Sequence, residues 1–283
     1  MITCFLKGGL GNQLFEIFTT ISYAIKSNQN FSFLYSRTLN GSPERPTYWN
    51  SFLLCLKMFT VHKLPENMHI MSEENFNYKE LPINTSKNII LDGYFQSYKY
   101  FEYYFENICK LIQLDKQKTM IQQKHLYNYK NMISMHFRIG DYKHKQNYHP
   151  VMNLQFYKNS IQHIINITDK LDLKFLYFCE DEDVEEVSDM IEQLQHSFEK
   201  CKFISANSNS NIKTNIEDWE QMLMMSLCQH NIIPNSTFSW WGAYFNSNTE
   251  KIVCYPDVWF GPAVSKRIVD DLFPESWTKI SCH

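Results

Sequence analysis

Short apolar runs recur along this chain, and each is followed by a polar or glycine-containing stretch. Continuous apolar runs are typical of strands that are buried on both faces of a parallel sheet. We expect strands at residues 2–6, 31–35, 88–92, 132–135, 174–179, 202–204 and 251–254. Apolar residues at helical spacing follow several of these runs, as Leu14, Ile17 and Ile21 do near the N-terminus. The alternation of strands and helices predicts an α/β fold with parallel sheets.

A polar segment rich in lysine and glutamine, residues 114–131, interrupts this alternation. A chain of 283 residues is long enough for two domains of ordinary size. We therefore predict an N-terminal domain at 1–128 and a C-terminal domain at 129–283, joined through this helix or linker.

Composition and charge narrow the function classes. Hydrophobic residues make up 44% and charged residues 20% of the chain, which is typical of a folded globular protein. The net charge of −3 gives no reason to expect nucleic acid or an anionic membrane as a partner. With no secretory signal pattern and no apolar window that could span a bilayer, a soluble, cytoplasmic protein is expected. Eight scattered cysteines without C-x-x-C spacing predict reduced thiols rather than a zinc site or disulfides.

Residues 7–13 form a glycine-rich turn between the first expected strand and the first expected helix. Unpaired N–H groups and the helix dipole make such a turn a natural anion site, with Gly9 and Gly11 as candidate phosphate-binding positions. Asn12 is expected to cap the helix. A Walker A loop is excluded because Gly-Lys-Ser/Thr is absent, and a dinucleotide fingerprint because Leu14 replaces the third glycine. A tight turn before a capped helix, without any ligand, is the alternative interpretation.

A polar cluster of His136, Arg138, Gly140 and Asp141 follows the strand expected at 132–135. Ligands bind beyond the carboxyl ends of strands in open α/β sheets, so chemistry is expected here. The Arg138 guanidinium offers a planar fork of donors that matches phosphate or carboxylate. The alternative is a surface ion pair between Arg138 and Asp141 across a turn.

A second strand-to-helix junction, which begins with Asn235, Ser236 and Thr237, is dense in hydroxyl groups. These side chains and the N–H groups beside them could cradle phosphate oxygens. The alternative is that they only cap the helix.

The acidic cluster at 180–183 follows the strand expected at 174–179 and allows two interpretations. Asp181 and Asp183 have the D-x-D spacing of a metal site, where Mg²⁺ or Mn²⁺ would bridge a diphosphate. Acidic residues are also favoured in the first turn of a helix, and a helix is expected to run from here to about residue 195. We favour the helix start because D-x-D alone is a weak pattern, and we predict no metal site.

Six motifs, taken together, resemble the inverting α-1,2-fucosyltransferases of glycosyltransferase family 11. They lie at 8–15, 93–101, 136–142, 225–233, 235–243 and 255–256. The resemblance implies a GT-B-type enzyme, in which two Rossmann-like domains face each other across a cleft. It also implies inverting, metal-independent transfer of L-fucose from GDP-L-fucose to a sugar hydroxyl in an α-1,2 linkage. The acceptor would be a glycan, with galactose as the candidate sugar, and no cofactor would be needed.

The resemblance assigns roles to the first two clusters. Arg138, in an H-x-R motif, would bind the β-phosphate of the donor, and His136 and Asp141 would shape its loop. Asn12 would face the diphosphate or the reacting sugar from the opposite domain. Glu16 and Asp141 are the candidates for a general base on the acceptor hydroxyl.

The resemblance also places the third cluster at the donor. Ser236 and Thr237, with Asn235 before them, would line the nucleotide-phosphate pocket. Gly9 and Gly11 would contribute from the N-terminal loop.

One position departs from the family pattern. The family usually has two consecutive arginines in H-x-R-R-x-D, and Ile139 occupies the second position here. Lys143 or Lys145 would then supply the missing charge, or the donor would be another nucleotide-deoxysugar such as an activated rhamnose. Two further alternatives are a metal-dependent transferase that uses Asp181 and Asp183, and a catalytically silent protein that binds carbohydrate or nucleotide. Acceptor specificity is expected to reside in the poorly patterned region 38–87.

Overall fold

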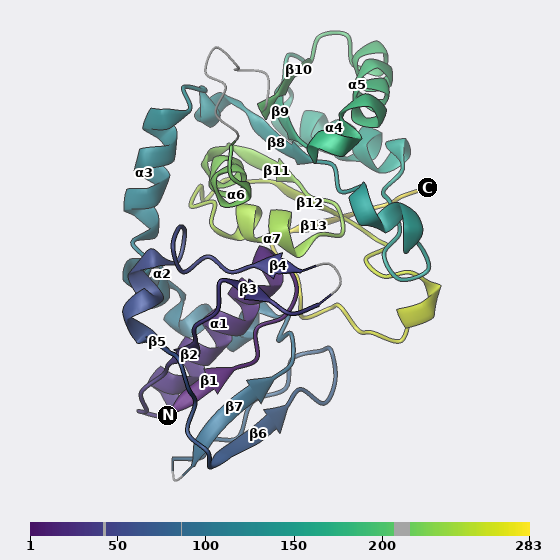
Figure 1. Cartoon of the computed structure of the whole chain (residues 1–283). Helices are drawn as coiled ribbons and strands as arrows, with labels where there is room; N and C mark the ends of the chain where they lie inside the picture. Colours follow the sequence, from purple (N-terminus) through teal and green to yellow (C-terminus); the bar gives the residue numbers. More distant parts are fainter. Residues whose placement is uncertain (42–43, 86, 207–215) are drawn as a thin grey trace. The chain divides into compact units, whose positions relative to one another are not determined.

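The computed structural model describes residues 1–41, 44–85, 87–206 and 216–283 (Figure 1). The chain divides into two compact units. Unit 1 consists of Met1–Thr119 and Arg267–Pro274, and unit 2 consists of Met120–Lys266 and Glu275–His283. The first change of unit falls within α3 (Leu114–Lys124). Whether residues 1–128 and 129–283 are separate domains stays a prediction.

Unit 1 is built on short parallel strands. Its three-stranded sheet has the order β1-β7-β6 with both neighbouring pairs parallel, and β2 and β5 form a second parallel pair. A single parallel bridge joins Ile2 to Phe31, just before β2. The strands are β1 (Ile2–Cys4), β2 (Phe33–Leu34), β5 (Thr60–Val61), β6 (Met68–Ser72), β7 (Asn88–Asp92), and the antiparallel pair β3 (Thr38–Leu39) and β4 (Arg45–Pro46).

The long helix α1 (Leu10–Lys26) forms the centre of unit 1. Nearly all of its residues up to Ala24 are buried, because apolar side chains lie on more than one face of the helix. The aromatic segment after β7 packs on it, with ring centres 5.9 Å apart for Phe15 and Phe101 and 5.6 Å apart for Phe18 and Phe101. The other helical elements here are α2 (Phe105–Leu111), η1 (Leu54–Phe59), η2 (Tyr98–Tyr100) and η3 (Glu102–Tyr104).

Unit 2 contains a six-stranded parallel sheet in the order β10-β9-β8-β11-β12-β13. β8 is the first of these six strands along the chain, so this is the doubly wound order 3-2-1-4-5-6. The strand order reverses between its first and fourth strands, β8 and β11. The strands are β8 (Ile133–His136), β9 (Lys174–Phe178), β10 (Lys202–Ser205), β11 (His230–Ile232), β12 (Val253–Pro256) and β13 (Thr278–Ile280). The helices include α4 (Leu154–Thr168), α5 (Val184–Ser197), α6 (Asp218–Leu227) and α7 (Thr237–Tyr244). The switch point of this sheet therefore lies between β8 and β11.

The predicted α/β class with parallel sheets is confirmed. A strand forms at each of the seven predicted runs, although several are shorter than the apolar pattern suggests. Six strands of the described residues were not predicted, namely β3, β4, β5, β6, β11 and β13. β11 is buried but contains His230 and Asn231, whose polarity hides it from an apolar pattern. The Asn231 amide is satisfied inside the fold, where it donates to the Ser134 hydroxyl at 2.7 Å and to the Met225 carbonyl oxygen at 2.9 Å.

Two findings concern the expectations from composition. All eight cysteines are free thiols, and Cys4, Cys179 and Cys254 are buried among apolar residues. Among the described residues, no helix combines the length and the apolar character that a bilayer crossing requires.

Candidate active site

Two loops leave the sheet of unit 2 at its switch point. Because β8 and β11 are neighbouring parallel strands, their carboxyl ends lie at the same edge of the sheet (Figure 1). The loop after β8 carries Arg138 and the turn η5 (Gly140–His144), and the chain after β11 carries Asn235 and Ser236 into α7. Tyr142 connects the two loops, since its hydroxyl donates to the Asn235 carbonyl oxygen at 3.3 Å. The topology thus joins two of the predicted polar clusters.

Arg138 is the centre of an ion-pair network at this edge. One of its terminal nitrogens donates to Glu180 and the other to Asp141. Asp141 also accepts from the Lys145 ammonium group at 3.1 Å. The guanidinium carbon lies 4.7 Å from the centre of the Tyr142 ring, within the range of a cation–π contact. The predicted pairing of Arg138 with Asp141 is confirmed, but it forms part of a network at the switch point rather than an isolated surface pair.

Gly140 allows the loop after β8 to approach Glu180, which follows β9, closely. Its φ is +30°, a region that residues with a side chain rarely adopt. A Cβ atom at this position would collide with the Glu180 carboxylate and would lie 2.9 Å from a terminal nitrogen of Arg138. The contact between Arg138 and Glu180 therefore requires glycine at this turn.

Asp183 fixes the same turn from the other side. Its buried carboxylate accepts from the Gly140 N–H group at 2.6 Å and from the Lys143 ammonium group at 3.1 Å. Asp183 directly precedes α5, as the helix-start interpretation of the acidic cluster predicted. Both carboxylate oxygens of the second aspartate of the D-x-D pattern thus bind groups of the protein. The described residues contain no cluster of three or more His, Cys, Asp or Glu side chains that could hold a metal ion.

His136 ends β8 beneath the Arg138 loop. Burial, with a smaller effect of the Arg138 charge, lowers its pKa from 6.5 to about 3. The ring packs against Phe238 at 5.6 Å between centres, and its Nδ1 atom is buried without a hydrogen-bond partner. Its carbonyl oxygen accepts from the Tyr157 hydroxyl at 3.1 Å. His136 is therefore neutral at physiological pH, which suits a residue that shapes the loop better than one that binds phosphate as a cation.

The chain after β11 presents the third predicted cluster. The Asn235 amide group donates to the Pro150 carbonyl oxygen at 3.0 Å and to that of Trp259 at 3.2 Å, so its donors hold the loop within unit 2. Ser236 is the N-cap residue of α7, but its side chain makes no capping hydrogen bond. The helix thus begins, next to Thr237, without a side-chain cap on its first N–H groups.

Ile139 and the two nearby lysines lie in different surroundings. Ile139 is 2% exposed and belongs to the hydrophobic core of unit 2, so it contributes packing rather than charge. Lys143 is held on the α5 side by Asp183 and by Glu186, the latter at 2.7 Å. Lys145 instead shares Asp141 with Arg138. Of the two predicted substitutes for the missing arginine, only Lys145 is connected to the Arg138 network by a described contact.

The glycine loop lies in unit 1. The structure places the N-cap of α1 at Gly9, whose cap position has no side-chain hydrogen bond, so the predicted capping by Asn12 is wrong. Helix α1 starts earlier than expected, at Leu10, which puts Gly11 and Asn12 inside its first turn. The Asn12 side-chain oxygen accepts from the Gln96 amide at 3.0 Å. The loop is a helix N-terminus without a side-chain cap, as an anion site requires.

Glu16 lies one turn further along α1 and is fully buried. Its Oε2 atom accepts from the Lys7 N–H group at 2.9 Å, and its Oε1 atom is buried without a partner. Burial raises the pKa of this carboxyl well above its ordinary value, and the nearby carboxylates Glu73 and Asp92 raise it further. Lys7 opposes this rise and also forms an ion pair with Asp92 at 2.5 Å. Unit 1 thus contains a carboxyl group with a strongly raised pKa near the glycine loop.

The sequence pattern did not identify Glu180 and Tyr142 as partners of Arg138, or Glu73 as a neighbour of Glu16. Glu180 follows β9, which is the parallel neighbour of β8, so strand order would have placed it beside Arg138. Glu73 follows β6 and accepts from the N–H groups of Tyr94 and Phe95 at 2.8 and 3.0 Å. Strand order cannot be deduced from apolar runs alone when β6 and β11 are absent from the pattern.

The chain is similar to known proteins over nearly its whole length. The family model described as Glycosyl transferase family 11 matches residues 1–281. The chain is 28% identical to the O-antigen biosynthesis glycosyltransferase WbnK of Escherichia coli, across 95% of this chain and 98% of that protein. It is 23% identical to an alpha-1,2-colitosyltransferase of Escherichia coli, across 97% of each. It is 25% identical to a galactoside 2-alpha-L-fucosyltransferase of Caenorhabditis elegans, across 99% of this chain and 79% of that protein.

Proposed function

Because the chain belongs to glycosyltransferase family 11, we propose that it transfers L-fucose from GDP-L-fucose to a glycan hydroxyl in an α-1,2 linkage. Membership of this family makes the chain a glycosyltransferase that acts on a sugar. The name of the Caenorhabditis elegans relative supports both fucose as the transferred sugar and a galactose-containing acceptor. The observation that carries the proposal is the Arg138 network at the switch point of a doubly wound sheet, the place where such sheets bind nucleotides.

In this proposal Arg138 binds the β-phosphate of the donor. Its two terminal nitrogens are aimed at the carboxylates of Glu180 and Asp141, and a phosphate group presents oxygens at a similar spacing to the same fork. Ser236 and Thr237 stand at the uncapped start of α7, where N–H groups and the helix dipole favour an anion. Gly9, Gly11 and Asn12, at the uncapped N-terminus of α1 in unit 1, form a second anion-binding position in this proposal.

We extend the proposal to metal-independent transfer with inversion. The acceptor oxygen attacks C1 of the β-linked fucose while the bond from C1 to the diphosphate breaks, which leaves an α-linked product and GDP. Negative charge develops on the departing diphosphate, and Arg138 and Lys145 carry fixed positive charge beside it. Preorganised donors of this kind can supply the stabilisation that a metal ion gives in other transferases.

The proton of the acceptor hydroxyl needs a base. Asp141 is engaged by Arg138 and Lys145, and two cations make a carboxylate a poor proton acceptor. Glu16 has a pKa that burial raises well above its ordinary value, as suits a general base, and its Oε1 atom has no partner. Of the two predicted candidates, Glu16 therefore has the properties of a general base and Asp141 does not.

A second candidate donor is another nucleotide-activated deoxysugar. One Escherichia coli relative is named as a colitosyltransferase, and colitose is a deoxysugar other than fucose. Ile139 also occupies the position of the second family arginine and is buried in the core. Activated rhamnose is a further member of this chemical class.

Thermal unfolding with nucleotides separates these donors. We expect GDP and GDP-L-fucose to raise the unfolding temperature by several degrees, because a ligand at a hundredfold excess over its Kd adds about 2.7 kcal/mol to stability. UDP and dTDP should have no effect. Arg138→Lys should abolish most of the shift, whereas Arg37→Lys, at an exposed arginine of unit 1, should keep it. Stabilisation by UDP or dTDP, but not by GDP, would contradict the proposed donor.

A further inference from the structure

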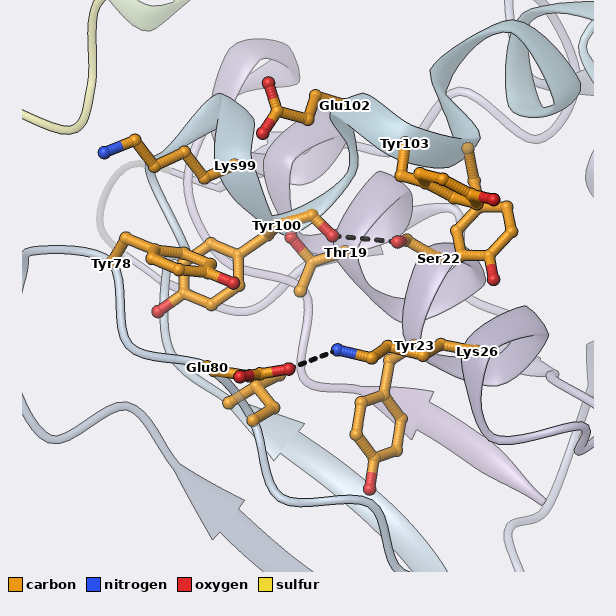
Figure 2. A pocket seen from close by; sticks show the side chains of 12 residues that line it. Thr19, Ser22, Tyr23, Lys26, Tyr78, Glu80, Lys99, Tyr100, Glu102 and Tyr103 are labelled. Atoms are coloured by element: carbon orange, nitrogen blue, oxygen red, sulfur yellow. Dashed lines mark hydrogen bonds and ion pairs between the residues drawn. The ribbon is translucent and has the colours of Figure 1, made fainter.

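A cavity of about 400 Å³ lies in unit 1, apart from the glycine loop (Figure 2). The second half of α1, the chain after β6 and the turns η2 and η3 surround it. Its α1 residues, Thr19 to Lys26, follow Leu10 by about 14 to 24 Å along the helix axis, at 1.5 Å per residue. The cavity is therefore separate from the N-terminal end of α1, where the glycine loop lies.

Tyrosine rings dominate the walls of this cavity. Tyr78 meets Tyr100 edge to face with 4.8 Å between ring centres, and Tyr103 meets Tyr104 in the same way at 4.8 Å. Figure 2 shows Tyr78 and Tyr100 together and Tyr103 across the pocket from them. Tyr103 is 84% exposed, which is unusual for a large aromatic side chain. Exposed ring faces of this kind fit the C–H faces of a pyranose ring.

Both ammonium groups of the cavity are already paired with carboxylates. Lys26 forms an ion pair with Glu80 at 2.6 Å, Lys99 pairs with Asp271, and Glu102 adds a further carboxylate to the lining. A site without an unpaired cation favours a neutral ligand over a phosphate or an acidic sugar. The same groups can donate to and accept from sugar hydroxyls. Aromatic walls with a few polar groups, at this volume, are typical of small-molecule sites.

We propose that this tyrosine pocket binds a neutral sugar unit of the acceptor glycan, remote from the hydroxyl that receives fucose. The proposal rests on the proposed function, because it takes the ligand to be the acceptor of that reaction. The pocket would give longer acceptors an additional contact, and it would not touch the reacting atoms. It therefore acts on affinity for the glycan and not on the chemical step.

A binding experiment without donor tests the pocket by itself. The protein with labelled tyrosine rings is titrated with a neutral, galactose-terminated tetrasaccharide, and ring resonances are followed by NMR. We expect the signals of Tyr78 and Tyr103 to move, and Tyr103→Ala to weaken binding about fivefold, as one lost sugar–aromatic contact predicts. Met58→Ala, at a residue of unit 1 that is 81% exposed, is the control and should leave binding unchanged. Unmoved Tyr78 and Tyr103 signals would overturn the proposal.

A transfer experiment tests the connection to the acceptor. Tyr103→Ala should raise KM about fivefold for the tetrasaccharide and leave kcat, and KM for the terminal disaccharide, unchanged. An equal change of KM for both acceptors would overturn the assignment of the pocket to a remote sugar unit. If the wild-type protein transfers fucose to neither acceptor, the proposed function fails, while the titration still decides whether the pocket binds sugar.

Discussion

A single guanidinium connects the sequence motif to the proposed chemistry. Arg138 is held by Glu180 and Asp141 and is 14% exposed, so it is both oriented and accessible. A donor phosphate would compete with these carboxylates for the same fork of N–H groups. We therefore expect opposite effects on donor binding when Arg138 and when Glu180 is replaced.

Replacing Arg138 by lysine keeps the charge and removes the fork. We expect kcat/KM to fall by about 100-fold or more, in the range found when one preorganised donor is lost from a transition-state site. Glu180→Gln should have the opposite effect on donor binding and tighten it, because it removes a negative charge that competes with phosphate. Circular dichroism should show an unchanged fold for both variants. Near-normal turnover and donor affinity in Arg138→Lys would remove this residue from the mechanism.

The lowered pKa of His136 predicts how the free energy of unfolding depends on pH. Its pKa is near 6.5 in the unfolded chain and about 3 in the folded protein. Between these values the unfolded state binds a proton that the folded state does not, so the free energy of unfolding falls as the pH falls. The slope from this residue is up to about 1.4 kcal/mol per pH unit, and the stabilisation is complete above pH 6.5.

The measurement is denaturant unfolding of the wild type and His136→Gln at a series of pH values between 6.5 and 4. The variant should lose this part of the slope, whatever its absolute stability, since all other titrating groups are common to both proteins. Parallel curves for the two proteins would show that His136 is not buried in its neutral form.

Among the elements, the turn η5 and the residue after it carry two lysines with different ion-pair partners. Lys143 pairs with Asp183 and Glu186 beside α5, whereas Lys145 pairs with Asp141 next to Arg138. The two lysines are only two residues apart in the sequence, but only Lys145 adds charge to the Arg138 network. Variants of these two lysines therefore test which one supplies the positive charge of the family's second arginine, where this chain has Ile139.

Lys145→Met should weaken GDP binding several-fold, because a positive charge close to the diphosphate is lost. Lys143→Met should leave GDP affinity unchanged and lower the unfolding temperature, since Asp183 loses a partner that helps to fix the turn. Isothermal titration with GDP measures the first effect, and thermal unfolding measures the second. Equal GDP affinities for Lys145→Met and the wild type would contradict a role of Lys145 at the phosphates.

The elements also show which parts of the fold the sequence could predict. Apolar strands such as β8 and β9 were visible because burial on both faces demands a continuous apolar run. β11 was not, since Asn231 is a buried polar residue and one of its partners, Ser134, is far away in the chain. The start of α1 was misplaced because a glycine N-cap leaves no side-chain signal, and Asn12 offered a stronger but misleading one.

In the molecule as a whole, the order of the six motifs along the chain predicted the family. The strand order of the unit 2 sheet explains why two of those motifs lie at the same edge. The clusters at Arg138 and Ser236 are far apart in the chain, and they lie at one sheet edge because β8 and β11 are neighbours. Only one of the two ion-pair partners of Arg138 could be predicted from the sequence. Asp141 lies three residues away in the same turn, whereas Glu180 reaches Arg138 through the pairing of β9 with β8. Long-range contacts of this kind depend on topology, which a local pattern does not contain.

A transfer assay tests the proposed fucosyl transfer from GDP-L-fucose. The purified protein is incubated with GDP-L-fucose and a galactose-terminated acceptor in excess EDTA, and the product is examined by mass spectrometry and NMR. We expect the acceptor to gain one deoxyhexose, joined in α configuration to O2 of galactose, at the same rate with and without EDTA. No transfer from GDP-L-fucose, together with consumption of a different nucleotide-deoxysugar or a strict requirement for Mg²⁺ or Mn²⁺, would contradict it.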